Sequence, residues 1–343
     1  KVFANKSKGK FIVKIPFLKI GEAIADQPII QGGMAVSVST SELAVAVAEE
    51  GGIGVIGGTG LSLDDLRRQM REARASTKGI LGLNIMVAAR EFKESVIVSL
   101  KEKVDVVIAG AGFSRDVFTI CREWKTPVII MVASAKVARL AERLGAAAVI
   151  VEGCDAGGHL GTEEKTTDLL PAICEAVSIP VIAAGGFVNG RDIAQQLELG
   201  AAGVQLGTRF LLSDECTVHK NFKDLLINAK APDLVRIMSP VGLPANAILT
   251  PLVKKYLSGD SSIQPQSCDG CLKKCGRLFC ILEALRRARD GDYERGLFFT
   301  GKRFPDITSV EPVKKIFSDL LQETQVYLER VLEKDAPAPT GAG

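Results

Sequence analysis

A short apolar segment, a glycine-containing loop and an amphipathic helix recur eight times between residues 28 and 212, and this repeat constrains the fold most strongly. Each apolar segment suits one strand, and each helix suits a crossover between parallel strands. The predicted strands are 28–30, 53–56, 80–86, 104–109, 127–131, 148–151, 180–184 and 203–206. Eight βα units in about 180 residues predict an α/β chain folded as a (β/α)8 TIM barrel. A doubly wound sheet of eight parallel strands is the alternative, but the even spacing favours closure.

The rest of the chain is divided by its composition. Residues 1–27 are expected to form an N-terminal extension, and 28–212 the barrel. Residues 213–333 read as a mostly helical addition that acts as a lid, with predicted helices at 214–230, 253–257 and 312–333 and another that ends near residue 289. The tail 334–343 is rich in Pro, Gly and Ala and is predicted to be disordered. Within the barrel, Ser39 and Glu42 have the spacing of a capping box for the first helix.

Charge and hydropathy exclude several classes of partner. The net charge is +3 with both signs well mixed, so we expect no nucleic acid and no membrane surface as a partner. No apolar run reaches the roughly 20 residues that a membrane-spanning helix needs. The start of the sequence carries no signal-peptide pattern, which predicts a cytoplasmic protein. The expected partner is a small-molecule substrate, and a homodimer is among the states that the sequence leaves open.

The loop after the sixth predicted strand carries the strongest functional signal. It runs from Glu152 through Gly157 and Gly158 to His159, one of only two histidines in the chain. Glycines allow a backbone to approach a ligand closely, and an imidazole can bind a substrate oxygen or move a proton. We therefore expect His159 to be catalytic at the rim of the barrel. The second histidine, His219, lies in a polar stretch and is interpreted as a surface residue.

Two glycine-containing turns follow the seventh and eighth predicted strands. Gly185-Gly186 and Gly207-Thr208 occupy the loops where barrels commonly bind phosphate through backbone N–H groups. Either pair alone would favour a simple tight turn over a binding site. Two pairs on adjacent strands favour a phosphate site.

The order of these segments resembles the nitronate monooxygenase family, which includes 2-nitropropane dioxygenases and the flavin-dependent enoyl-ACP reductase II. The resemblance covers about residues 16–250 and rests on the segments 28–34, 82–86, 152–161, 180–186 and 204–210. It implies a barrel with non-covalent FMN and His159 facing the substrate. The cofactor-binding residues that it implies are Gly33, Met34, Asn84, Glu152, Gly157, Gly158, Gly185, Gly186, Gln205, Gly207 and Thr208.

The resemblance leaves more than one activity open. A glutamate at position 152 resembles the reductase branch of the family. The segment 239–244, in contrast, resembles the corresponding segment of its monooxygenase members. The first expectation is an FMN-dependent oxidation of alkyl nitronates or related carbon acids. The alternative is an NAD(P)H-dependent flavin reductase of the enoyl-ACP reductase II type. A flavin-free barrel isomerase or lyase that acts on a phosphorylated metabolite is a third reading.

Four of the eight cysteines are clustered outside the predicted barrel. Cys268, Cys271, Cys275 and Cys280 have the spacing C-x2-C-x3-C-x4-C. Four thiolates so close in sequence suit a 4Fe–4S cluster or a zinc ion, and the short spacing resembles iron–sulfur sites more than two separated zinc pairs. Four reduced cysteines without a ligand, or an adventitious disulfide among them, are the remaining interpretations. Cys121, Cys174 and Cys216 are expected to be small core residues.

Overall fold

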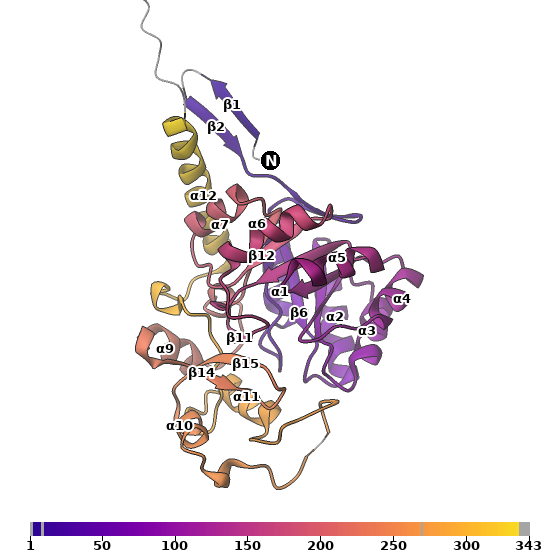
Figure 1. Cartoon of the computed structure of the whole chain (residues 1–343), viewed down its shortest axis with the longest axis vertical. Coiled ribbons are helices and arrows are strands. Elements are labelled where there is room, and N and C mark those ends of the chain that lie inside the picture. The colour runs from indigo at the N-terminus through magenta and orange to yellow at the C-terminus, as the bar shows by residue number, and fades with distance from the viewer. Residues whose placement is uncertain (1–2, 8–9, 269, 336–343) are drawn as a thin grey trace, which may run out of the picture.

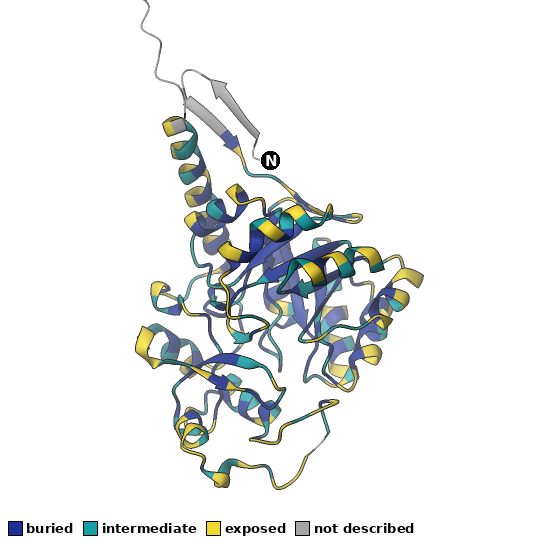
Figure 2. Ribbon diagram, viewed as in Figure 1, coloured by how far each residue is buried: buried dark blue, intermediate teal, exposed yellow. Residues whose placement is uncertain are grey.

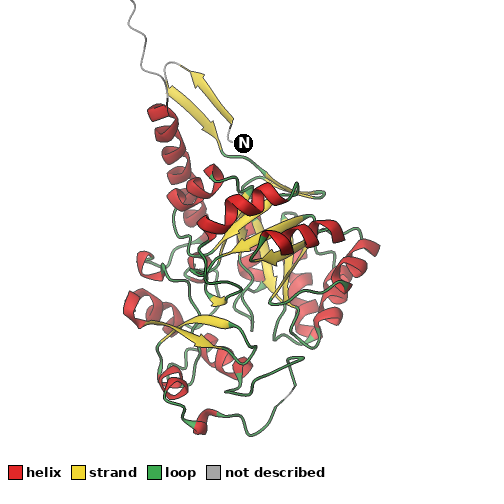
Figure 3. Ribbon diagram, viewed as in Figure 1, coloured by secondary structure: helices red, strands yellow, loops and turns green. Residues whose placement is uncertain are grey.

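The computed structural model describes residues 3–7, 10–268 and 270–335. Eight parallel strands close a barrel, and helices surround it (Figures 1 and 3). The order around the barrel follows the chain, with the last strand paired to the first. The strands are β5 (Ile29–Gln31), β6 (Ile53–Gly57), β7 (Ile80–Met86), β8 (Val106–Gly110), β9 (Val128–Val132), β10 (Ala148–Glu152), β12 (Val181–Ala184) and β13 (Gly203–Leu206). The predicted (β/α)8 barrel is confirmed.

The barrel is filled by apolar side chains. Ile30, Val55, Ile108 and Ile150 lie in one buried cluster inside it. The other faces of the strands pack against the surrounding helices, so the strands are buried on both sides (Figure 2). This is why the strands read as continuous apolar runs in the sequence.

Each strand of the barrel is followed by a helix. These helices are α1 (Ser41–Glu49), α2 (Leu63–Ser76), α3 (Phe92–Lys101), α4 (Asp116–Glu123), α5 (Ala135–Leu144), α6 (Thr166–Ala176), α7 (Gly190–Glu198) and α8 (Thr208–Leu211). Local signals set several of their ends. The side chain of Ser134 caps the start of α5, and Gly145 ends it with a φ of 98°. Asn189 and Asp192 form a capping box at α7.

The capping box predicted at Ser39 is wrong. The N-cap of α1 is Thr40, whose side chain makes no capping hydrogen bond. Oγ of Ser39 instead accepts hydrogen bonds from Nε2 of Gln31 at 2.8 Å and from the backbone N–H of Met34 at 2.9 Å. The hydroxyl is used to fix the turn after β5, which local spacing does not reveal.

The N-terminal extension forms two hairpins. Strands β1 (Phe3–Ser7) and β2 (Lys10–Lys14) are antiparallel, as are β3 (Leu18–Ile20) and β4 (Ala23–Ala25). Leu18, Ile20 and Ala25 belong to the buried cluster inside the barrel. The second hairpin therefore packs on the core at the end of the barrel where the strands begin.

Beyond Ser213 the chain is less helical than predicted. It contains α9 (Lys220–Asn228), β14 (Leu234–Met238), β15 (Pro244–Ile248), α10 (Pro251–Leu257), α11 (Ile281–Arg289) and α12 (Val313–Asp335), with short 3-10 turns at Ala231–Asp233, Ser261–Ile263 and Phe304–Asp306. Strands β14 and β15 form an antiparallel sheet with β11 (Gly158–His159). The helix predicted from residue 214 starts only at Lys220, because Ser213 and Asp214 bond to Glu311 instead.

The last helix returns to the barrel and packs on α7. The backbone N–H of Gly190 donates to Glu323, and Oγ1 of Thr324 donates to the Gly190 carbonyl at 3.0 Å. In the described part of the chain, no helix combines the length and apolar character needed to cross a bilayer. Residues 336–343 of the predicted tail lie outside the described residues.

Candidate functional site

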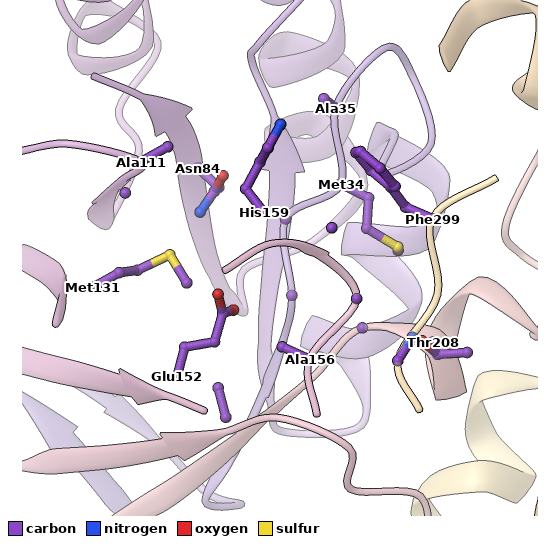
Figure 4. A pocket seen from close by; sticks show the side chains of 18 of the residues that line it. Met34, Ala35, Asn84, Ala111, Met131, Glu152, Ala156, His159, Thr208 and Phe299 are labelled. Atoms are coloured by element: carbon purple, nitrogen blue, oxygen red, sulfur yellow. Dashed lines mark hydrogen bonds between the residues drawn. The ribbon is translucent and has the colours of Figure 1, made fainter. Parts of the chain in front are cut away.

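A cavity of about 380 Å³ opens at the end of the barrel where the strands finish (Figure 4). Residues at the ends of β5, β7, β10, β12 and β13 line it, as does the loop after β10. All twelve residues predicted for catalysis or cofactor binding are among its lining. They are Gly33, Met34, Asn84, Glu152, Gly157, Gly158, His159, Gly185, Gly186, Gln205, Gly207 and Thr208.

The turn after β5 and the strand β7 fit closely together on one side of the cavity. A Cβ atom placed on Gly33 would lie 2.2 Å from Cβ of Asn84, so a larger residue at position 33 would displace Asn84. Oε1 of Gln31 accepts the N–H of Val55 at 3.0 Å, which ties the end of β5 to β6. These contacts hold Gly33, Met34 and Asn84 in fixed places on the wall.

Strand β15 holds the loop that carries His159. Gly158 and His159 pair with Asn246 and Ala245 in β15. The side chain of Asn246 is 1% exposed, and its Nδ2 donates to two carbonyls of the loop, Cys154 at 3.0 Å and Ala156 at 2.8 Å. A segment about ninety residues further along the chain therefore fixes the orientation of the histidine loop.

His159 lies at the cavity wall with two specific neighbours. Nε2 is 2.8 Å from Oγ of Ser239, and the ring of Phe299 lies edge-on at 5.3 Å between centroids. Oγ of Ser239 also accepts the N–H of Val241 at 3.1 Å, which leaves its own proton free to be donated to Nε2. Burial lowers the pKa of His159 from 6.5 to about 4. The imidazole is thus neutral near pH 7.

Glu152 ends β10, and its carboxyl group points into the cavity on the side of Asn84 and Met131 (Figure 4). Burial raises the pKa of this carboxyl group from 4.5 to about 8. At pH 7 the group is therefore mainly protonated. A neutral carboxylic acid can donate a hydrogen bond into the cavity, which a carboxylate cannot do.

The turns after β12 and β13 border the cavity with glycine backbone, and the turn after β13 leaves open space beside it. Gly185 and Gly186 have φ values of 125° and 75°, a region that glycine adopts without strain. A Cβ atom on Gly207 would meet no atom within 4 Å, so the backbone here faces free space. Nearby, Oε1 of Gln205 is buried with no hydrogen-bond partner within the described structure. A ligand that donates a hydrogen bond at this point would satisfy it.

Several lining residues come from the C-terminal part and escaped prediction from the sequence. They include Leu272, Ile281, Leu297, Phe299, Thr300 and Gly301. Oγ1 of Thr208 accepts the N–H of Gly301 at 3.0 Å, and Nζ of Lys302 pairs with Asp155 at 2.8 Å. No short motif marks these positions. Ser239, in the segment 239–244, is a further site residue, and nothing in the sequence marks it as a partner of His159.

The four clustered cysteines are not part of the cavity lining. All are free thiols, and their side chains do not converge, since no group of three or more His, Cys, Asp or Glu that could hold a metal occurs among the described residues. The predicted metal centre is therefore not assembled in this arrangement. Burial raises the pKa of the Cys271 thiol, and charge repulsion from Cys280, Cys268 and Cys275 raises it further. Outside this group, Cys121 and Cys216 are buried as predicted, whereas Cys174 is only partly so.

The chain resembles known proteins both in sequence and in fold. The family model described as nitronate monooxygenase matches residues 19–96 and 87–323. A probable nitronate monooxygenase of Staphylococcus aureus is 26% identical, and the match covers 89% of this chain and 96% of that protein. The structure of FabK from Thermotoga maritima superposes with a TM-score of 0.82 at 37% identity, and covers 90% of this chain and 96% of that one.

A third relative carries a different enzyme name. The (3aS,4S,5R,7aS)-5-hydroxy-7a-methyl-1-oxo-octahydro-1H-indene-4-carboxyl-CoA dehydrogenase of Mycobacterium tuberculosis is 36% identical over 237 residues. The match covers 68% of this chain and 66% of that enzyme's length. It therefore spans slightly less than two thirds of the relative.

Proposed function

Because the chain belongs to the nitronate monooxygenase family, we propose that it is an FMN-dependent oxidoreductase that oxidises alkyl nitronates or related carbon acids. One observation carries the proposal. Twelve residues chosen from the sequence for catalysis or flavin binding, from five strand ends and the histidine loop, line a single cavity. Sites at this end of a barrel commonly carry the chemistry.

The residues present fit FMN in three respects. A cavity of about 380 Å³ lies in the range of about 300–1,000 Å³ for cofactor and ligand sites. The unpartnered Oε1 of Gln205 accepts a donor such as a flavin ring N–H. The open space at Gly207 suits a phosphate, which Gly185, Gly186 and Thr208 would help to bind. Met34, Asn84 and Glu152 would then border the ring.

The side chains around the cavity would bind the substrate and transfer protons. FMN, when bound, supplies a ring that exchanges hydride or single electrons. His159, neutral near pH 7 and oriented by Ser239, would hydrogen-bond the electron-withdrawing group of the substrate or take up a proton from its carbon. Glu152, protonated at the same pH, would donate a hydrogen bond from the opposite side. Phe299 places an apolar ring beside the imidazole.

A second candidate function has a specific observation in its favour. The relatives at 36% and 37% identity are a carboxyl-CoA dehydrogenase and FabK, whereas the probable nitronate monooxygenase is 26% identical. In this alternative the substrate is a thioester, and the enzyme reduces an enoyl thioester with electrons from NAD(P)H. In the first function the substrate is oxidised and molecular oxygen accepts the electrons. Both reactions use the same cavity.

The test is to purify the full chain and identify what it carries. We expect one FMN per chain, released on denaturation. Anaerobic mixing with an alkyl nitronate should bleach the flavin absorbance, and oxygen should restore it. Bleaching by NAD(P)H followed by recovery with an enoyl-CoA identifies the reductase instead. A colourless protein that neither contains nor binds FMN contradicts both functions and favours a flavin-free barrel isomerase or lyase. A cytoplasmic location and a homodimer remain predictions.

A further inference from the structure

The hydroxyl group of Ser239 lies behind the cavity wall and contacts the ring of His159. Ser239 is 1% exposed and is not among the described residues that line the cavity, whereas His159 is one of them (Figure 4). Oγ of Ser239 lies 2.8 Å from Nε2 of His159. The proposed reaction leaves the imidazole two roles, hydrogen-bond donor or base. Which of the two it can fill depends on which ring nitrogen carries the proton.

Ser239 and the histidine loop are attached to the same hairpin. Ser239 lies in the turn between β14 and β15, where its N–H donates to the carbonyl of Leu243 at 2.9 Å. Strand β15 pairs with β11, and the N–H of Leu160, directly after His159, donates to the carbonyl of Pro244 at 2.8 Å. Backbone hydrogen bonds therefore hold the serine hydroxyl in place relative to the imidazole.

The hydroxyl proton of Ser239 has one available acceptor. Oγ accepts the N–H of Val241 at 3.1 Å, so this contact does not use the hydroxyl proton. In the described part of the chain, Nε2 of His159 is the only acceptor within hydrogen-bond distance of that hydroxyl. A buried hydroxyl group donates its proton where an acceptor is in reach. Ser239 therefore donates to Nε2, and Nε2 is the nitrogen without a proton.

The other ring nitrogen of His159 faces the cavity. A neutral imidazole has one N–H group, and when Nε2 accepts a hydrogen bond the proton is on Nδ1. Nδ1 makes no hydrogen bond with the residues that the structure describes, yet it is not one of the buried polar atoms without a partner. Because His159 lines the cavity, Nδ1 is open to it and presents an N–H group there.

We propose that Ser239 is a positioning residue that holds His159 as the Nδ1–H tautomer, so that the imidazole meets the substrate as a hydrogen-bond donor and not as a base. The acceptor would be a substrate oxygen that carries negative charge, such as an oxygen of a nitronate. This role in the reaction rests on the proposed function, whereas the tautomer does not.

The other titratable groups at the cavity do not replace the missing base. Among the described lining residues they are Glu152 and Arg303. Arginine remains a cation, and Glu152 is mainly protonated at pH 7, because burial raises its pKa to about 8. A substrate that must lose a carbon proton therefore finds no ready acceptor for it. We infer that the substrate is ionised before it binds.

The first test reads the tautomer in the full chain as purified. The sequence has only two histidines, so labelling with 15N-histidine reports two rings, and His219→Gln identifies the signals of His159. His219 is an internal reference of opposite kind, because its Nδ1 accepts the N–H of Asn221 at 3.1 Å and its proton is then on Nε2. Long-range 1H–15N correlation spectra at about pH 7.5 distinguish the two forms.

We expect Nδ1–H for His159 and Nε2–H for His219. An Nε2–H signature for His159, or a mixture of both forms, overturns the proposal. FMN is measured on the same sample. A protein without FMN contradicts the proposed function, but an Nδ1–H signature in it still supports the tautomer.

The second test removes the serine hydroxyl. In Ser239→Ala the Nε2–H form of His159 should appear, and turnover of an alkyl nitronate should fall about tenfold, the effect of one hydrogen bond. FMN content should stay at the parental value. Ser239→Thr keeps a hydroxyl and should recover the Nδ1–H form. Ser258→Ala, at an exposed serine that ends α10, is the matched control.

A comparison of two substrates completes the test. The parent should oxidise an alkyl nitronate much faster than the neutral nitroalkane from which it forms. Equal rates would assign His159 the role of a base and overturn the proposal. If Ser239→Ala does not fold, or if the chain turns over neither compound, the spectra of the parent decide the tautomer.

Discussion

His159 and Glu152 line the same cavity, and burial moves their pKa values in opposite directions. The pKa of His159 falls to about 4 and that of Glu152 rises to about 8. Between these values both side chains are uncharged. Each can still donate or accept a hydrogen bond, so the cavity has proton-handling groups without a fixed charge from either.

Replacing His159 tests its catalytic role. His159→Gln should keep FMN bound, because the imidazole contacts Ser239 and Phe299 in the wall. Turnover should fall by about 100-fold or more, the usual contribution of a positioned acid–base group. His219→Gln is the control, since His219 lies on the surface at the N-cap of α9. Parental turnover in His159→Gln would remove the imidazole from the mechanism.

Replacing Glu152 tests its protonation through the pH dependence of stability. The folded protein keeps a proton on Glu152 that the unfolded chain releases near pH 4.5, so the free energy of unfolding should fall as pH rises toward about 8. His159 acts in the opposite sense and only below pH 6.5, where the unfolded chain takes up its proton.

The informative window is therefore between pH 6.5 and 8. Urea unfolding of the parent should show stability declining across it, and Glu152→Gln should lack most of that decline. Glu175→Gln, an exposed position on α6, is the control and should behave like the parent. Equal slopes for the parent and Glu152→Gln would mean that Glu152 is ionised in the folded state.

At the scale of the element, the turns at the ends of β12 and β13 decide what the cavity can bind. Parallel strands end at the same rim, so glycines far apart in sequence meet there. Gly185 and Gly186 bend the chain after β12, and Gly207 leaves open space after β13. Thr208 joins this rim to Gly301 of the C-terminal part. The phosphate proposal depends on these turns together.

Two substitutions at Gly207 separate shape from charge. Its φ of −102° suits any residue, and an added Cβ atom meets nothing within 4 Å, so Gly207→Ala and Gly207→Asp should both fold. Gly207→Ala should weaken FMN binding modestly. Gly207→Asp should abolish it, because the carboxylate repels a phosphate. The measurement is the FMN affinity by fluorescence titration, and equal affinities in the two variants would count against a phosphate at this turn.

For the whole molecule, the C-terminal part completes the site and ties the chain together. Phe299, Thr300 and Gly301 form part of the cavity wall, and β15 holds the histidine loop. Helix α12 then returns to α7, where a Cβ atom on Gly190 would lie 2.3 Å from the carbonyl oxygen of Leu320. The close approach of two backbones explains why glycine stands at the start of α7.

Gly190→Ala should therefore push α12 away from the barrel. The added methyl group would clash with backbone atoms of α12 and strain the hydrogen bonds of Gly190 with Glu323 and Thr324. We expect the free energy of unfolding to fall by about 1–3 kcal/mol. Urea denaturation of the full chain measures this loss. Gly276→Ala, where the nearest atom would be 3.6 Å away, should leave stability close to that of the parent. No loss in Gly190→Ala would mean that the two helices can separate without cost.

The sequence alone determined the barrel and the rim of its site. Predicted barrel strands lie within two residues of those observed, because burial on both faces leaves continuous apolar runs that local reading detects. The twelve site residues could be predicted without knowledge of tertiary contacts. Parallel topology by itself brings the ends of the strands together at one rim.

Only the tertiary structure decided which residues from distant segments complete the rim and close the barrel. Ser39 fixes a turn instead of capping α1, and Ser239 reaches His159 from eighty residues along the chain. Phe299 enters the wall from a segment without a motif, and a hairpin at the N-terminus closes the other end of the barrel. These contacts join segments distant in sequence, and a local pattern of apolar and polar residues records that a side chain is buried but not which partner buries it.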